Sequence, residues 1–173
     1  MPHTLTAEEE FCLEGCRGYA QYYHMRQNFE AKHCTFCNID RTVNDVIWED
    51  ECVRAWEIPK KFQRSELAVQ CMVVPVRHIR FPWELRKTEL LSLSGAQIFL
   101  SREFDLPGGM WFARFGDMSL NSGTVPHLHY NLWVPNGTGK VSIPVLKGHE
   151  ARIENQVRAA TFAAQYEDGK VPT

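Results

Sequence analysis

The sequence predicts one domain in which helices accompany a set of short strands. Its 173 residues fit a single domain large enough to bury most of its apolar surface. Between a helical segment at each end, the predicted order is hairpin, strand, helix, strand, strand. The last of these strands, residues 127–134, alternates apolar and polar residues as a half-buried strand does.

Charge and composition exclude several partners. Lys and Arg number 19 against 21 acidic residues, so no basic field gathers nucleic acid or binds a membrane surface. The first ten residues do not have the pattern of a signal peptide, and no stretch approaches the ~20 apolar residues that span a bilayer. We therefore expect a soluble cytoplasmic protein, in which Cys-x-x-Cys indicates metal binding or redox chemistry.

The first predicted element is an N-terminal helix. Thr6 followed by Glu9 forms a capping box that opens a helix of about 20 residues. The residues on one stripe of this helix are Cys12, Cys16, Tyr19 and Tyr23. Cys12 and Cys16 could bind a metal at i and i+4, but a buried helix face with cysteines as small apolar residues is the simpler interpretation. His24 has no obvious partner there.

The middle of the chain supplies the strands. Residues 43–48 and 52–58 predict a hairpin, and residues 69–74 a central strand with a nearly continuous apolar run. Residues 82–104 predict a helix that contains Gly95, and residues 110–115 a further strand after the break at Pro107.

Two elements are predicted after the alternating strand. Residues 140–146 follow the Asn136-Gly137 turn and are compatible with another strand. Residues 150–166 predict an amphipathic helix with Ile153, Val157 and Phe162 on its apolar side.

Two polar patterns point to chemistry. His127, His129 and Asn131 are two residues apart and are expected on one face of their strand. Cys34 and Cys37 form a Cys-x-x-Cys that fits a redox pair, half of a zinc site, or two thiols without a special role.

Taken together, the motifs closely resemble the histidine triad superfamily of nucleotide hydrolases and transferases. The segments that carry the resemblance are Cys34-x-Phe36-Cys37-x-Ile39, Trp48-Glu49-Asp50, Ala55-Trp56-Glu57-Ile58-Pro59, Val73-Val74-Pro75-x-Arg77-His78-Ile79 and Pro126-His127-Leu128-His129.

The resemblance implies an α+β fold in which a curved, mostly antiparallel sheet packs against helices. The motifs lie in a core of residues 34–135, with an extra helical extension at residues 1–31 and a strand and helix in residues 136–173. It also implies a homodimer.

The third histidine of the triad is absent, because Asn131 stands at its position. This resembles the branch with galactose-1-phosphate uridylyltransferase and the dinucleoside polyphosphate phosphorylases, which has an amide there. An amide donates hydrogen bonds to a phosphate oxygen but supplies no proton at neutral pH.

By resemblance, His129 is the nucleophile that attacks an α-phosphorus and becomes a nucleotidyl-imidazole. The family places phosphate donors before this strand, where this chain has Ser122, Gly123 and Thr124. Thr124 matches a family Ser/Thr, whereas Ser122 and Gly123 depart from the pattern. The same three residues also suit an ordinary turn.

The zinc-bearing branches of the family imply four ligands here, Cys34, Cys37, His78 and His127. A Cys2His2 set suits a closed, tetrahedral, structural zinc site. His33 is a substitute ligand, and the alternative is two free thiols and a surface histidine.

The nucleoside contacts implied by resemblance are Phe36, Ile39 and Ile58 beside the base and Glu57 on the ribose hydroxyls. A carboxylate can accept two hydrogen bonds from a cis-diol. Phe36 and Ile58 also suit the core, and the sequence does not orient Arg77, Arg80 or Arg114 toward a second phosphate.

Two functions follow. The first is a hydrolase or nucleotidyltransferase that acts on a nucleoside phosphate or dinucleoside polyphosphate through nucleotidyl-His129. The second is a zinc-stabilised module that binds nucleotides with little turnover.

Overall fold

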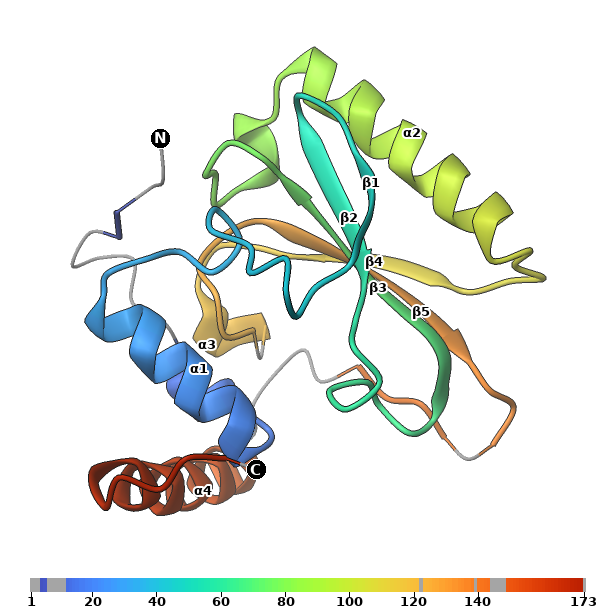
Figure 1. Cartoon of the computed structure of the whole chain (residues 1–173). Helices are drawn as coiled ribbons and strands as arrows, with labels where there is room; N and C mark the ends of the chain where they lie inside the picture. The colour runs from blue at the N-terminus through green and yellow to red at the C-terminus, as the bar shows by residue number, and fades with distance from the viewer. Residues whose placement is uncertain (1–3, 6–11, 122, 139, 144–148, 173) are drawn as a thin grey trace. The chain divides into compact units, whose positions relative to one another are not determined.

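The computed structural model describes residues 4–5, 12–121, 123–138, 140–143 and 149–172. Its elements, in chain order, are η1 (Leu13–Gly15), α1 (Tyr19–Glu30), β1 (Val46–Glu49), β2 (Val53–Glu57), β3 (Leu67–Pro75), η2 (Pro82–Glu84), α2 (Lys87–Glu103), β4 (Met110–Arg114), α3 (Met118–Asn121), β5 (His129–Pro135) and α4 (His149–Glu167) (Figure 1). They form two compact units, one of residues 39–116 and 127–143 and one of residues 1–38, 117–126 and 144–173. The prediction of one domain over the whole chain stays a prediction.

The unit of residues 39–116 and 127–143 is a five-stranded sheet with α2 on one face (Figure 1). The strand order is β1-β2-β3-β5-β4, and every neighbouring pair is antiparallel. The chain leaves β3, forms α2, and returns as β4 at the sheet edge before β5 fills the place between them. This confirms the α+β class and the predicted order of hairpin, strand, helix, strand, strand.

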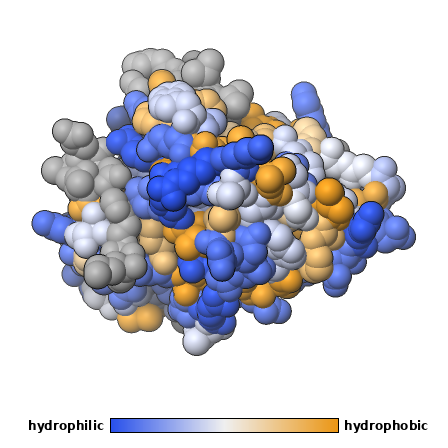
Figure 2. Space-filling model, turned by 90° about the horizontal axis from the view of Figure 1, so that it is seen from above, coloured by the Kyte–Doolittle hydropathy of each residue, from blue (hydrophilic) through white to orange (hydrophobic). Residues whose placement is uncertain are grey.

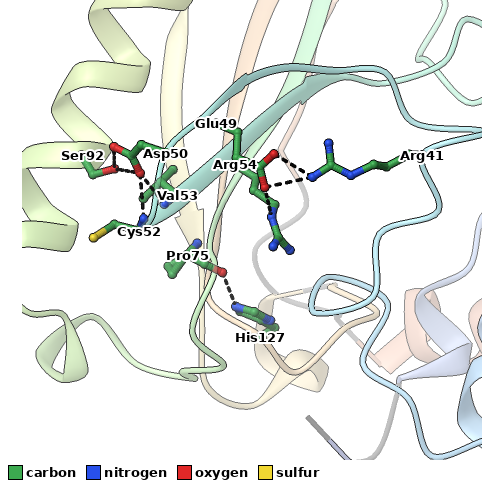
Figure 3. A network of polar contacts seen from close by, with 9 residues as sticks. All are labelled: Arg41, Glu49, Asp50, Cys52, Val53, Arg54, Pro75, Ser92 and His127. Atoms are coloured by element: carbon green, nitrogen blue, oxygen red, sulfur yellow. Dashed lines mark hydrogen bonds and ion pairs between the residues drawn. The ribbon is translucent and has the colours of Figure 1, made fainter. Parts of the chain in front are cut away.

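The hairpin turn and α2 are joined through one carboxylate. Asp50 accepts hydrogen bonds from the backbone N–H groups of Cys52 (2.8 Å) and Val53 (2.9 Å) (Figure 3). The Ser92 hydroxyl of α2 donates to the same carboxylate at 2.6 Å. The pKa of Asp50 is lowered, because these hydrogen bonds outweigh the opposing effect of burial.

The core of this unit lies between the sheet and α2. Its buried residues are Val53, Ala55, Cys71, Val73, Leu93, Ala96, Leu100, Leu132 and Val134. The strand members alternate along β2, β3 and β5, so they all come from one face of the sheet. The residues that alternate with them point to the opposite face of the sheet, which α2 does not cover.

The outward side of α2 remains partly apolar. Leu90, Leu91 and Ile98 are exposed there. On the face of the molecule in Figure 2, apolar residues occur as separate patches between hydrophilic ones. Dimerisation through any such patch stays a prediction.

In the other unit, α1 and α4 lie side by side (Figure 1). The Phe162 ring of α4 contacts the rings of Tyr19 and Tyr22, with centroids 6.0 and 5.8 Å away. Phe162 therefore packs as predicted. Ile153 and Val157 do not, because they are 49% and 63% exposed.

The predicted N-terminal helix is interrupted. Among the described residues, a single 3-10 turn precedes α1, and Gly18 at the N-cap of α1 has an extended backbone (φ −146°, ψ 158°). A glycine gives up helical geometry easily, which explains the break. Cys12 and Tyr19 thus do not share one helix, although Cys16 is buried as expected. Thr6 and Glu9 lie outside the described residues.

Two further boundaries differ from the prediction. Residues 140–143 form no strand, and the rest of the segment predicted to residue 146 lies outside the described residues. β5 begins at His129, so His127 precedes the strand. No helix among the described residues is long and apolar enough to cross a membrane.

Candidate functional site

β5 places His129 and Asn131 on the sheet face opposite α2. Asn131 pairs with Met72 of β3 and Phe112 of β4, while its neighbour Leu132 pairs with Cys71 of the core. Because side chains alternate along a strand, Asn131 and His129 project from the face that α2 does not cover. Both side chains are buried, with 4% of each residue exposed.

The His129 ring is held in one tautomer. Its Nδ1 lies 2.7 Å from the backbone oxygen of His127. A carbonyl oxygen only accepts hydrogen bonds, so Nδ1 carries the proton and Nε2 presents a lone pair. The hydrogen bond therefore fixes the ring so that Nε2 is the nitrogen with the lone pair.

Burial keeps this imidazole neutral. It lowers the pKa of His129 to about 3, although the hydrogen bond to His127 opposes the shift. The positive charge of Arg114, directly opposite on β4, lowers the pKa further. A neutral ring is the form that can act as a nucleophile.

Asn131 presents a hydrogen-bond donor without an acceptor. Its Nδ2 is fully buried and has no hydrogen-bond partner among the described residues. An unpaired buried polar group costs about 1–3 kcal/mol of folding free energy. Two residues from His129, such a donor is suited to a ligand oxygen.

His127 is oriented by the end of β3. Its Nε2 lies 3.1 Å from the Pro75 backbone oxygen (Figure 3), so Nε2 donates and Nδ1 keeps the lone pair. The backbone N–H of Leu128 donates to Ile79 O at 2.7 Å and fixes the segment. The His78 and His127 ring centroids are 4.7 Å apart. A hydrogen bond such as the one from His127 Nε2 to the Pro75 carbonyl is of the kind that orients metal-binding histidines.

The four predicted zinc ligands form one group. One ligand atom from each of Cys34, Cys37, His78 and His127 lies within 4.8 Å of the others. Zinc with Zn–S bonds of about 2.3 Å and Zn–N bonds of about 2.0–2.1 Å in a tetrahedron separates its ligand atoms by roughly 3.3–3.8 Å. The four ligand atoms, within 4.8 Å of one another, are near enough to close around one ion. Two thiolates and two imidazoles leave no open position, so the chain has a structural zinc site. His33 is exposed and is not part of the group.

The loop predicted to bind phosphate has contacts of its own. The Gly123 backbone N–H donates to Asn121 Oδ1 at 2.8 Å, and the Thr124 carbonyl accepts from Cys12 N–H at 3.0 Å. A side chain on Gly15 would meet the Gly123 carbonyl at 2.7 Å, so the loop packs closely on η1. Ser122 lies outside the described residues, and the phosphate role of the loop stays a prediction.

The predicted nucleoside residues occupy different environments. Phe36 is buried, while Ile39 and Ile58 are half-buried. The Glu57 carboxylate pairs with Lys60 Nζ at 2.7 Å, and Glu57 pairs in register with Cys71 of the core face. By strand alternation Glu57 belongs to the face opposite His129. Its ribose role stays a prediction.

Sequence reasoning did not select the aromatic residues on the face that carries His129. By register they are Trp56, Phe112 and Trp133. Trp56 and Trp133 are buried, and Trp133 meets Phe112 edge-on with ring centroids 4.9 Å apart. Strand alternation in the sequence could have identified them. Trp133 lies two residues after Asn131 and so shares its face, and Trp56 directly precedes Glu57 and so lies on the face opposite to it.

Comparisons with known proteins identify no family model and no curated protein that match this chain. Among solved structures, the chain is similar to a HIT family hydrolase from Clostridium thermocellum, with 23% identity, 63% of this chain and 96% of that chain covered, and a TM-score of 0.48. It is also similar to a Zn-bound histidine triad family protein from Mycobacterium smegmatis, with 18% identity, 79% and 97% covered, and a TM-score of 0.44.

A third similar structure is the Plasmodium falciparum diadenosine triphosphate hydrolase in complex with cyclomarin A. The identity is 13%, 74% of this chain and 81% of that chain are covered, and the TM-score is 0.44.

Proposed function

We propose that this chain is a histidine triad enzyme that transfers a nucleotidyl group from a nucleoside phosphate or dinucleoside polyphosphate to water or another acceptor. One observation carries the proposal: His129 donates from Nδ1 to the His127 carbonyl at 2.7 Å, which leaves Nε2 with a lone pair. A buried, neutral and oriented imidazole is what nucleophilic attack on phosphorus needs.

The reaction has two displacements. Nε2 of His129 bonds to the α-phosphorus, and the leaving-group oxygen departs with the electron pair of the broken P–O bond. An acceptor oxygen then attacks the same phosphorus, loses its proton to solvent, and breaks the N–P bond, which returns the lone pair to Nε2. The proton on Nδ1 stays in place throughout.

Asn131 limits the choice of leaving group. Its buried N–H donates to a phosphate oxygen in this scheme, but an amide cannot protonate a departing atom. A phosphate leaves as a stable anion, whereas an amine needs a proton first. We therefore expect phosphoanhydrides to react faster than phosphoramidates.

The remaining site residues keep the roles that the resemblance implies. Ser122, Gly123 and Thr124 bind phosphate, and Phe36, Ile39 and Ile58 bind the nucleoside; Glu57, which lies on the face opposite His129, is the exception. The two cysteines and two histidines would hold a structural zinc, which would tie His127 to its neighbours. Because the His127 carbonyl accepts from His129, rigidity at His127 also orients the nucleophile.

Release of nucleoside monophosphate from diadenosine tri- and tetraphosphate tests the proposal. His129→Ala should reduce the rate at least about 1,000-fold, because the nucleophile is lost. His24→Ala, at an exposed histidine of α1, is the matched control and should keep the unmutated rate. Equal release by His129→Ala and the unmutated protein would rule out the enzyme function.

Trapping the intermediate tests nucleophile and substrate class together. Acid-free quenching and peptide mass analysis should find a nucleotidyl adduct on the peptide that contains His129. An adduct on another residue contradicts the assignment.

A nucleotide-binding module with little turnover is the second candidate, and the absence of an acid at Asn131 favours it. It predicts that AMP binds to the unmutated protein while neither adduct nor release is detected. The same two assays therefore separate the candidates.

A further inference from the structure

Arg114 lies directly beside the proposed nucleophile. It ends β4 and is the register partner of His129 on β5. Opposed residues of antiparallel strands have Cβ atoms about 4.5–5.5 Å apart and share one face of the sheet. The guanidinium and the imidazole therefore emerge together from the face opposite α2.

The guanidinium is directed along β4 toward the second site residue. Its Cζ lies 5.6 Å from the centroid of the Phe112 ring. Phe112 is in turn the register partner of Asn131. The Arg114 cation is thus held on β4 beside the row formed by His129 and Asn131.

The backbone just after Arg114 has little freedom. Gly116 has φ +70°, donates from its N–H to Arg80 O at 3.0 Å, and a side chain there would meet Phe81 at 2.8 Å. These contacts fix the end of β4. The backbone from which the Arg114 side chain extends is therefore fixed in position.

The other two arginines that follow the sequence motifs lie after the end of β3 and belong to no strand of the sheet. Arg77 donates from Nε and Nη2 to the buried Glu89 carboxylate, at 2.9 and 2.8 Å. The Arg80 guanidinium lies over Phe81, with Cζ 5.7 Å from the ring centroid. Neither pairs in register with His129 or Asn131, whereas Arg114 does.

We propose that Arg114 binds the non-bridging oxygens of the phosphate that His129 attacks. The inference rests on the proposed function and names a residue that the family motifs do not supply. A guanidinium offers several N–H donors in a planar fork that matches phosphate oxygens, and its charge persists at every relevant pH. With an amide at Asn131, the site has no third imidazole to provide positive charge, and Arg114 provides it.

The test compares Arg114→Gln and Arg114→Lys with the unmutated protein. The matched control is Arg102→Gln, which removes the charge of an exposed arginine in the last turn of α2. Affinity for AMP, inorganic phosphate and adenosine is measured by calorimetry, and the His129 adduct by mass analysis. Zinc content and circular dichroism establish that each variant is folded.

Arg114→Gln should weaken AMP and phosphate binding roughly 10- to 100-fold, as expected for lost hydrogen bonds to a charged group. Adenosine, which has no phosphate, should bind with less than a twofold change. The AMP and phosphate affinities of Arg114→Lys should fall between those of Arg114→Gln and the unmutated protein, because lysine keeps the charge and loses the planar fork of donors. Arg102→Gln should match the unmutated protein in all three.

The inference is overturned if Arg114→Gln binds AMP as well as the unmutated protein does. It is also overturned if AMP and adenosine lose affinity equally, since that is the result of a purely structural role. If the unmutated protein binds no nucleotide and forms no adduct, the proposed function fails and the inference falls with it. If the unmutated protein forms the adduct and Arg114→Gln forms it at the same rate, only the inference fails.

Discussion

The two faces of the sheet use neighbouring residues for opposite purposes. Leu132 and Val134 of β5 pack into the core beneath α2, while His129 and Asn131, which precede them in the same strand, carry polar groups. The α2 face is held by apolar burial, at about 25 cal/mol per Å² removed from water. The opposite face buries an amide donor that no described residue accepts.

The difference shows where folding free energy is given up for chemistry. His127 and His129 are also buried, but carbonyls of Pro75 and His127 accept their N–H groups. Only the Asn131 donor among these three is left for a ligand. Among these three site residues, the cost therefore falls on Asn131, which faces the proposed phosphate.

Loss of zinc should have the largest effect on the polar face. Cys34→Ser should reduce bound zinc to well below one per chain and lower the free energy of unfolding by more than about 4 kcal/mol, because metal binding is coupled to folding. Cys52→Ser, outside the four-ligand group, should keep one zinc. Elemental analysis and urea unfolding measure both; full zinc in Cys34→Ser would contradict the ligand assignment.

Leu132→Ala should damage the apolar face alone. Leu132 is 1% exposed, so its truncation should cost about 3 kcal/mol of unfolding free energy. The folded fraction should keep its turnover, since the side chain points away from His129. Leu91→Ala, at a position that is 65% exposed on α2, should cost less than about 0.5 kcal/mol in the same urea titration.

Asn131→Leu should move activity and stability in opposite directions. Removal of the donor should lower kcat/KM roughly 100-fold, by the loss of one hydrogen bond to the reacting phosphate. The free energy of unfolding should rise by about 1 kcal/mol, because an unpaired buried polar group disappears. Asn131→Gln, which keeps the amide, should retain more activity; a destabilised Asn131→Leu would show that the amide is paired in the free protein.

Glu89→Gln should reveal a pH-dependent contribution beside the core. Burial alone raises the pKa of Glu89, but hydrogen bonds from Arg77 and the Arg86 backbone N–H outweigh it, so the pKa is lowered. A carboxyl with a lowered folded pKa stabilises the protein above its unfolded pKa and loses this effect as pH falls through the folded value. Glu89→Gln should therefore cost roughly 1–3 kcal/mol at pH 7 and progressively less below about pH 4.

Urea titrations from pH 3 to 8 measure this difference. Glu103→Gln, at an exposed position in the last turn of α2, is the control and should show no comparable pH dependence. A constant difference across the range would exclude the linkage.

Sequence reasoning anticipated the features that depend on local pattern or on residue type. The hairpin, α2, β4 and the order of the strands follow from apolar periodicity and turn residues. The four metal ligands follow from their kind and from the resemblance, and the structure brings their ligand atoms together. Local periodicity also located α4, although it did not reveal that Ile153 and Val157 are exposed.

Only the tertiary structure decided the details that depend on partners distant in sequence. The tautomer of His127 depends on the Pro75 carbonyl, which belongs to another strand. The sequence did not distinguish Arg114 from Arg77 and Arg80, and the register of β4 and β5 placed Arg114 beside His129. The face occupied by Glu57 likewise follows from its pairing with Cys71. The physical reason is that a sequence encodes the period of each element directly, whereas register and backbone acceptors arise only when separate elements pair. For this protein, the sequence by itself determined the order of the strands and the helix between them and named the candidate site residues, and the fold determined which of these residues face one another.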